Sequence, residues 1–264
     1  MRLYDTHCHF EKADPTIVAA TLARARAAGV EKLMAVGGSP GLNQSAELAA
    51  QCAAETVVAP AVRVACGYDR EQTAAFKNDF SAASRQLSTA LAGSRPSATP
   101  VAAVGEVGLD YHYSPETREA QIALFRVQLE EARRLDLPVV IHTREADDDT
   151  IALLGEIPSR GIIHCYTGTV DGARRYLDLG FYVSISGIVT FRPAENVRDV
   201  ARFLPDDRIL IETDSPFLAP VPLRGTPNEP AFLVHTCTFL AALRGQAADD
   251  FAELTFANAE RIIG

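Results

Sequence analysis

Short apolar runs rich in β-branched residues alternate along the chain with longer stretches whose apolar positions recur at helical spacing. The short runs have the length of buried strands, and the longer stretches have the length of helices. The strands expected from this pattern are Arg2–Thr6, Lys32–Val36, Ala61–Gly67, Val101–Glu106, Pro138–His142, Gly161–His164, Gly180–Ser186 and Arg208–Thr213. The helices expected are Pro15–Ala28, Gly41–Ala54, Glu71–Leu91, Pro115–Leu135, Ala146–Ile157, Val170–Leu179, Glu195–Leu204, Glu229–Arg244 and Ala248–Ile263.

Strands that alternate with helices form parallel sheets with crossover helices. Eight such units in 264 residues predict an α/β protein with a closed (β/α)₈ barrel, or TIM barrel, and the alternative is an open doubly wound sheet. We expect one domain over residues 1–264. The linker-like stretch Gly93–Pro100 precedes a strand, so we expect it to be a surface loop on the bottom face.

Most of the histidines lie at or just after the carboxyl ends of the predicted strands, where two carboxylates also lie. A barrel gathers these strand ends on one face, and active sites are built there. Residues far apart in the sequence are therefore expected to converge. In chain order, the set is His7, His9, Glu106, His142, His164 and Asp214.

Four imidazoles and two carboxylates form a ligand set that suits divalent transition metals such as zinc or manganese. Six protein ligands exceed what one open catalytic ion needs, and they suit two ions that share a bridging carboxylate. Because residues i and i+2 of a strand point to the same side, His7 and His9 are expected to hold one ion together. Cys8 then points the other way, into packing.

The net charge of −9 argues against broad, salt-steered binding to nucleic acid, but it leaves open a phosphate held by metal ions and a few arginines. The five cysteines show no disulfide spacing, so we expect reduced thiols in a reducing compartment. No apolar run approaches the roughly 20 residues of a membrane span, and no signal peptide is evident. We expect a cytoplasmic protein without a membrane segment or an obligate protein partner.

Ordered motifs along nearly the whole chain resemble the TatD family of metal-dependent deoxyribonucleases, within the amidohydrolase superfamily. The motifs are "DTHCHF" (Asp5–Phe10), "GEVGLDY" (Gly105–Tyr111), "LPVVIHTREA" (Leu137–Ala146), "IIHCYTG" (Ile162–Gly168), "ETDSPFLAP" (Glu212–Pro220), "RG..NEP" (Arg224–Pro230) and the closing "LTFANAERIIG". Many relatives in the superfamily bridge their ions with a carbamylated lysine on strand four. Glu106 at that place favours the TatD-like enzymes.

The resemblance implies a barrel of the metallo-dependent hydrolase type with two divalent ions (zinc, manganese or magnesium). Glu106 would bridge the ions. The remaining ligands would divide into His7, His9 and Asp214 for one ion, and His142 and His164 for the other. Members of the family cleave DNA phosphodiesters, whereas relatives with similar motifs hydrolyse D-aminoacyl-tRNA esters, so a carboxylic ester is the alternative substrate.

Two stretches depart from the family pattern. Family members usually carry "GxHP" after strand three, but this chain reads "VACGYDRE", with Tyr68 and Asp69 where the histidine and proline would fall. A family "RGKRNEP" becomes "RGTPNEP", in which Thr226 and Pro227 replace two basic residues. Both changes remove groups expected near a phosphate, and neither touches the ligand set.

We expect a metal-activated water to attack the substrate, with Glu106 and Asp214 as the catalytic carboxylates. Asp214 would accept the proton of the water, or serve only as a ligand. Two nearby carboxylates, Glu212 and Asp5, precede ligand residues by two positions; each would accept a hydrogen bond from a ligand histidine or serve as a buried structural partner. Side chains expected to contact the substrate are Arg144, His112, Arg192 and Arg224.

Overall fold

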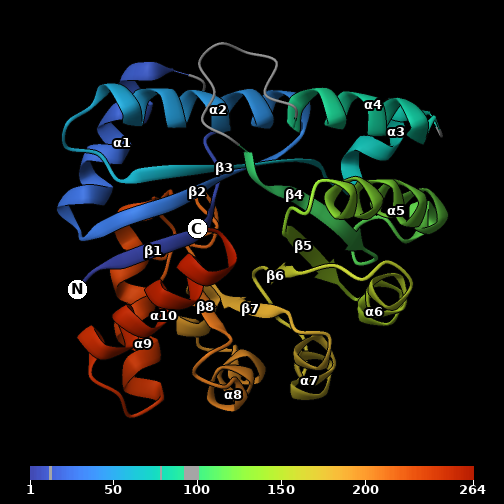
Figure 1. Cartoon of the computed structure of the whole chain (residues 1–264). Coiled ribbons are helices and arrows are strands. Elements are labelled where there is room, and N and C mark those ends of the chain that lie inside the picture. Colours follow the sequence, from blue (N-terminus) through green and yellow to red (C-terminus); the bar gives the residue numbers. More distant parts are fainter. Residues whose placement is uncertain (12–13, 78, 92–100) are drawn as a thin grey trace.

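The fold is an eight-stranded parallel sheet whose strands follow one another in chain order, which confirms the predicted (β/α)₈ barrel (Figure 1). The computed structural model describes residues 1–11, 14–77, 79–91 and 101–264. The strands are β1 (Leu3–Cys8), β2 (Val30–Gly38), β3 (Ala61–Tyr68), β4 (Val101–Asp110), β5 (Val139–Arg144), β6 (Gly161–Ile163), β7 (Tyr182–Ile185) and β8 (Ile209–Ile211).

The sheet closes between its first strand and the segment that follows its last strand. Cys8 and Ser215 form a parallel bridge there. The backbone N–H of His9 donates to the carbonyl oxygen of Ser215 at 2.7 Å, and the N–H of Asp214 donates to that of His7 at 2.9 Å. The hydrogen bonds that close the sheet therefore also join two of the segments that carry predicted ligands.

Helices surround the sheet, as Figure 1 shows. They are α1 (Pro15–Ala27), α2 (Pro40–Glu55), α3 (Thr73–Phe76), α4 (Phe80–Leu91), α5 (Arg118–Arg134), α6 (Asp147–Glu156), α7 (Val170–Asp178), α8 (Glu195–Phe203), α9 (Leu233–Leu243) and α10 (Ala248–Ile262). Within the described ranges, no helix is long and apolar enough to cross a membrane.

One predicted helix, Glu71–Leu91, is two helices in the structure. Lys77 takes a left-handed conformation with φ of 47° and ends α3. The carboxylate of Asp79 then accepts a hydrogen bond from the N–H of Ala82 at 3.2 Å, which caps the first turn of α4. The predicted loop Gly93–Pro100 lies outside the described residues.

Strand ends also differ from the prediction. The strands β6 and β8 have only three residues each, so His164 and Asp214 lie in the loops just beyond them. In contrast, β1 extends to Cys8 and β4 extends to Asp110. The face at the carboxyl ends of the strands is therefore built partly from strand and partly from loop.

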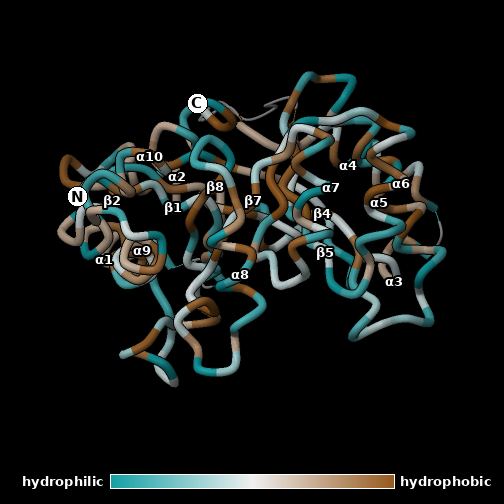
Figure 2. The backbone as a smooth tube through the Cα atoms, turned by 90° about the horizontal axis from the view of Figure 1, so that it is seen from below, coloured by the Kyte–Doolittle hydropathy of each residue, from teal (hydrophilic) through white to brown (hydrophobic). Residues whose placement is uncertain are grey.

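Apolar side chains fill two layers, one between the sheet and the helices and one inside the barrel. Figure 2 shows hydrophobic stretches mostly along the strands and the helices around them, and hydrophilic stretches mostly in the connections. Three residues of α10 join the inner layer, in which the rings of Tyr4 and Phe256 lie 5.7 Å apart. The inner layer contains Tyr4, Met34, Val36, Ala65, Ala103, Val140, Ile162, Tyr182, Leu210, Phe256, Ala259 and Ile262.

Candidate metal centre

The six residues predicted as metal ligands converge at the carboxyl ends of the strands. Three of them lie within strands, and the other three lie within three residues after the end of a strand. Five different segments of the chain contribute, which is possible because parallel strands of a barrel end on the same face. The strand residues are His7 of β1, Glu106 of β4 and His142 of β5, and the loop residues are His9, His164 and Asp214.

Glu106 lies between two pairs of histidines. Its Oε2 atom is 3.6 Å from His7 Nε2 and 3.4 Å from His9 Nε2. Its Oε1 atom is 3.3 Å from both His142 Nδ1 and His164 Nε2. One carboxylate thus offers a different oxygen to each pair, the arrangement that a bridging ligand requires.

Asp214 completes the first group. Its Oδ1 atom lies 3.8 Å from His7 Nε2 and 3.7 Å from His9 Nε2. The backbone of Asp214 has a φ of 54°, in the left-handed region that residues other than glycine seldom adopt. This conformation follows directly on β8 and aims the carboxylate at the two histidines.

The spacing of these atoms fits divalent ions. Ligands about 2.1 Å from a tetrahedral ion lie about 3.4 Å apart. The ring nitrogens of His7 and His9 are 3.0 Å apart, and those of His142 and His164 are 3.3 Å apart. Three sets of side chains are close enough to hold an ion: His7, His9 and Asp214; Glu106, His142 and His164; and His7, His164 and Glu212.

Burial and mutual charge set the protonation of this cluster. Burial would raise the pKa of the Glu106 carboxyl, but His164, His7 and His9 outweigh burial and hold that pKa well below its usual range. Burial and the neighbouring His164 lower the pKa of His7 to about 3. An ionised carboxylate and a neutral imidazole are the forms in which these groups bind metals. Burial raises the pKa of Asp214 to about 7.

A second row of acceptors orients the histidine rings. Glu212 Oε1 lies 3.3 Å from His164 Nδ1, which is the place considered for it from the sequence. The carbonyl oxygen of Val36 lies 2.9 Å from His9 Nδ1. Acceptors of this kind fix the tautomer and orientation of a ligand imidazole.

Asp110 is an orienting group that the sequence did not indicate. Its Oδ2 atom lies 3.0 Å from His142 Nε2, although Asp110 is 32 residues away in the chain. Burial opposes its ionisation, but His142 outweighs burial and lowers the pKa of Asp110 to about 2. The available signal was its place at the end of β4, four residues after Glu106.

Asp5 contacts the backbone and a hydroxyl group instead of an imidazole. Its carboxylate accepts hydrogen bonds from Thr213 Oγ1 at 2.6 Å and from the N–H of Thr213 at 2.9 Å. A longer bond of 3.3 Å comes from the N–H of His7. Asp5 therefore ties β1 to the loop that carries Asp214.

The side chains predicted to contact substrate differ in exposure: one is half-buried and three are exposed. Arg144 is half-buried at the end of β5, and its guanidinium lies 4.8 Å from the ring centre of Tyr113. His112 is exposed, with Nδ1 2.7 Å from Glu145 Oε1. Arg192 and Arg224 are exposed in the loops after β7 and β8, and Arg224 stacks 4.0 Å above the ring of Phe191.

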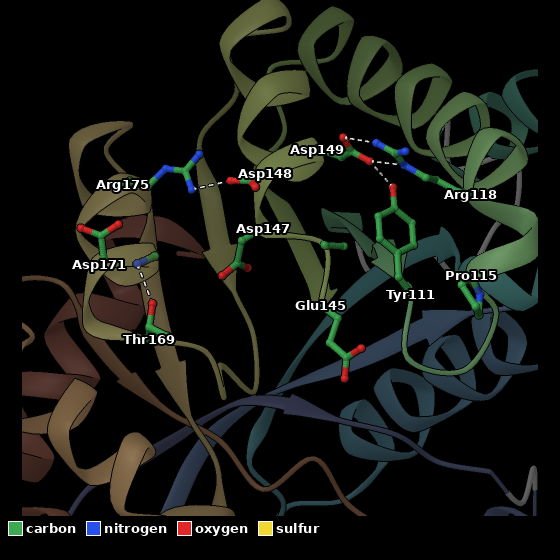
Figure 3. Close-up of a pocket in the computed structure, with 12 residues that line it drawn as sticks. Tyr111, Pro115, Arg118, Glu145, Asp147, Asp148, Asp149, Thr169, Asp171 and Arg175 are labelled. Carbon is green, nitrogen blue, oxygen red and sulfur yellow. Dashed lines mark hydrogen bonds and ion pairs between the residues drawn. The ribbon is translucent and has the colours of Figure 1, made fainter.

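A polar pocket of about 540 Å³ lies at the same ends of the barrel, after β4, β5 and β6 (Figure 3). Its arginines are already paired: Arg118 with Asp149 at 2.7 Å and Arg175 with Asp148 at 2.7 Å. Carboxylates outnumber cations here, so this pocket disfavours a phosphate. Its lining is Tyr111, Pro115, Arg118, Glu145, Ala146, Asp147, Asp148, Asp149, Thr169, Asp171, Gly172 and Arg175.

The alignment of the family motif "GxHP" with the segment at the end of β3 was wrong by one residue. Counted from Gly67, the histidine of "GxHP" falls on Asp69 and the proline on Arg70, one position later than Tyr68 and Asp69. Tyr68 is buried and packs its ring 5.0 Å from that of Phe76. Burial and the charge of Glu106 raise the pKa of Asp69 to about 6. Arg70, which the sequence did not indicate, lies 3.5 Å from Asp110.

The barrel and the cluster around Glu106 define a hydrolase of the metal-dependent class. The chain belongs to the TatD-related DNase family, whose model matches residues 4–264. It is 48% identical over 165 residues to YcfH, an uncharacterized metal-dependent hydrolase of Escherichia coli strain K12, and the alignment covers 61% of this chain and 62% of YcfH.

Two further proteins place the chain within this family. It is 36% identical over 171 residues to the 3'-5' ssDNA/RNA exonuclease TatD of Rahnella sp. strain Y9602, with 61% of this chain and 65% of that protein covered. The solved structure of YjjV, a TatD homologue from Escherichia coli K12, superposes with a TM-score of 0.84 at 29% identity and covers 99% of this chain and 98% of YjjV.

Proposed function

We propose that this protein is a two-metal phosphodiesterase that cleaves DNA. The observation that carries the proposal is Glu106, which presents one oxygen to His7 and His9 and the other to His142 and His164 at 3.3–3.6 Å. A shared carboxylate between two nitrogen-rich sets is the ligand pattern of paired catalytic ions. The name of the Rahnella relative supports a nucleic acid as the substrate.

Divalent ions held by these residues would polarise a phosphoryl oxygen and lower the pKa of a water from about 15.7 toward 7. His7, His9 and Asp214 would hold one ion, His142 and His164 the other, and Glu106 both. Asp214, whose carboxylate lies at the rim of the cluster, would take the proton that the attacking water loses.

The other polar side chains would act on the phosphate and the leaving group. As the water oxygen bonds to phosphorus, the ester P–O bond breaks and the leaving oxygen takes a proton, for which His112 is the candidate donor. Arg144, together with Arg192 and Arg224 from the opposite loops, would donate to phosphate oxygens. We also propose a cytoplasmic location, which five cysteines without a disulfide favour.

The test combines elemental analysis with a substrate panel of single-stranded DNA, duplex DNA, RNA, bis-p-nitrophenyl phosphate and a D-aminoacyl ester. We expect two ions per chain and hydrolysis of the phosphodiesters. Asp214→Asn should lower turnover by about 10²–10⁴-fold if Asp214 is the base. Asp136→Asn is the matched control, because Asp136 has a similar φ of 53° but lies in the turn before β5. Full activity of Asp214→Asn with both ions bound would remove the base role.

A second candidate function is hydrolysis of a carboxylic ester such as D-aminoacyl-tRNA. The observation that favours it is Asp69, a carboxyl that stands beside Glu106 where family members carry a histidine. A carboxylate there repels a phosphate and tolerates the ammonium group of an aminoacyl ester. Product analysis on both substrates separates the two functions: release of the amino acid from an intact tRNA would replace the first proposal with the second.

A further inference from the structure

Arg70 is placed beside the metal centre by the turn after β3. Its Nε atom is buried, lies 3.5 Å from Asp110 Oδ2 and has no hydrogen-bond partner. The only other carboxylate against it within the described part of the chain is Glu71, whose side chain is 70% exposed and lies 3.4 Å away. The Arg70 guanidinium therefore has one long contact with the buried carboxylate of Asp110 and one contact with the solvent-exposed carboxylate of Glu71.

A second guanidinium meets Arg70 at the same aromatic ring. The ring centre of Tyr113 lies 5.7 Å from the guanidinium carbon of Arg70 and 4.8 Å from that of Arg144. Tyr113 is 64% exposed, so this ring forms part of the surface. In the described ranges, Arg144 forms no ion pair, and its backbone lies opposite Asp110 in the register of β4 and β5.

The buried carboxylate of Asp110, which Arg70 contacts, has other hydrogen-bond donors. Asp110 accepts from His142 Nε2 at 3.0 Å and from the N–H groups of His112 and Tyr113, both at 3.0 Å. These contacts are all shorter than the one with Arg70. Arg70 therefore lacks the close carboxylate partner that Arg118 and Arg175 have in the acidic pocket of Figure 3.

The position of this pair relative to His142 defines what it can bind. The Nδ1 atom of His142 faces Glu106, where the scissile group must lie, and the Nε2 atom faces Asp110. Arg70 Nε contacts the same Asp110 oxygen, Oδ2, as His142 Nε2, and Nε2 is not the ring nitrogen that faces Glu106. A phosphate held by Arg70 is therefore a second phosphate of the substrate and not the one under attack.

We propose that Arg70 and Arg144, which both lie against the ring of Tyr113, form a subsite for the phosphate that neighbours the scissile bond. This inference rests on the proposed phosphodiesterase function and deepens it, because it makes a nucleotide chain, and not an isolated diester, the preferred substrate. Guanidiniums bind phosphate oxygens through paired, charge-assisted hydrogen bonds.

The first test measures binding to the metal-loaded protein by calorimetry, so that it does not depend on turnover. Thymidine 3′,5′-bisphosphate should bind at least about tenfold more tightly than either thymidine monophosphate. Arg70→Met and Arg144→Met, which keep the aliphatic volume, should each remove most of that difference, and Arg70→Lys should keep part of it. Arg174→Met is the matched control, because Arg174 also stacks on an aromatic ring, Phe203, and pairs with Asp171.

The second test compares kcat/KM for a thymidine dinucleotide with one internal phosphodiester and for the same dinucleotide carrying a terminal phosphate. The wild type should prefer the dinucleotide with a 5′- or a 3′-terminal phosphate to the unphosphorylated one about tenfold. In Arg70→Met, kcat/KM for the phosphorylated dinucleotide should fall far more than kcat/KM for bis-p-nitrophenyl phosphate, so that the preference is lost. An equal loss on every substrate, together with reduced metal content, would instead assign Arg70 a positioning role through Asp110.

The two proposals fail in different ways. A wild type that binds the bisphosphate preferentially but cleaves no phosphodiester would refute the proposed function and leave the anion subsite standing. A wild type that cleaves DNA but binds bisphosphate and monophosphate equally would refute the subsite alone. The same preference in Arg70→Met as in the wild type would also refute it.

Discussion

At the scale of single residues, Asp110 joins several parts of the site. It holds the outer nitrogen of His142, accepts two backbone N–H groups from the following loop and lies 3.5 Å from Arg70. One fully buried carboxylate thus fixes a ligand ring and the backbone that leads to Tyr113. Loss of this carboxylate should therefore first weaken the binding of the ion that His142 is proposed to hold.

Asp110→Asn should lower the affinity of the ion at His142 and His164 by about 10–100-fold, because an amide is a weaker and less directional acceptor for the His142 N–H. The ion at His7 and His9 should keep its affinity. Stepwise zinc titration followed by elemental analysis measures both. Asp149→Asn is the matched control, since Asp149 pairs with Arg118 at 2.7 Å outside the ligand cluster. Equal weakening of both ions would contradict the local role.

Thr213 is the partner on which buried Asp5 depends. Thr213→Val keeps the shape but removes the 2.6 Å hydrogen bond to Asp5, which leaves a buried carboxyl oxygen without its donor. We expect the free energy of unfolding to fall by about 1–3 kcal/mol, measured by urea denaturation. Thr21→Val, which removes an exposed hydroxyl on α1, should change it far less. Similar losses in both variants would show that burial of Asp5 is not the cause.

The residues that a strand period marks were predictable from the sequence, and those that depend on how loops fold back were not. His7 and His9 are two residues apart at the end of a strand, and this spacing points both side chains to the same side. Arg70 reaches the site only because β3 and β4 are neighbours and the turn after β3 brings its guanidinium back to Asp110. No local pattern in the sequence marks that return.

At the scale of elements, β4 and β5 leave no room between them for a side chain at Gly108, beside the site. Gly108 has a φ of 133°, and a Cβ atom at this position would lie 2.0 Å from the carbonyl oxygen of His142. Only glycine combines this conformation with that contact. The closeness holds Glu106 and His142, on adjacent strands, at the distance that a shared ion needs.

Gly108→Ala should therefore destabilise the fold and displace His142. We expect a loss of about 2–4 kcal/mol in the free energy of unfolding, since both the backbone conformation and the contact are unfavourable. Gly155→Ala is the matched control: Gly155 lies within α6 with open space around it, so alanine should be neutral or stabilise by up to about 1 kcal/mol. Denaturation and metal content measured together decide, and an unchanged Gly108→Ala protein would contradict this reading of the strand contact.

Element boundaries were harder to predict than elements. The helical period continues across Lys77, so the sequence pattern favours one helix where a left-handed residue separates α3 from α4. The strands β6 and β8 end early for a related reason. The sequence predicted strands as far as His164 and Thr213, but the chain leaves the sheet after Ile163 and Ile211 and brings His164 and Asp214 over the site. Function at the strand ends overrides local propensity.

At the scale of the whole molecule, the bound ions should act as a clamp, because they connect five segments of the barrel. Ions at about 100 times their Kd add about 2.7 kcal/mol per site if they bind only the folded chain. Removal of the ions with a chelator should therefore lower Tm by about 5–10 °C or more. Scanning calorimetry with and without added zinc or manganese measures this. A Tm that does not respond to metal in either direction would contradict a metal centre at this place.

The barrel itself was predictable because it follows from the alternation of strands and helices along the whole chain and not from any single segment. Alternating strands and helices leave few topologies, and parallel crossover connections favour a ring when eight units are present. The route by which the ring closes was not predictable, since it runs through Ser215, beyond the last strand. Nor did composition reveal that a helix after the barrel enters its inner layer.

That helix has a consequence for biosynthesis. The last strand ends at Ile211, whereas α10 begins at Ala248. A ribosome therefore releases all eight strands before it releases the helix that packs into their inner layer. Until then the aromatic ring of Tyr4 lacks its partner Phe256. The inner layer of a nascent chain thus stays open to chaperones and proteases until α10 has been synthesised and has docked.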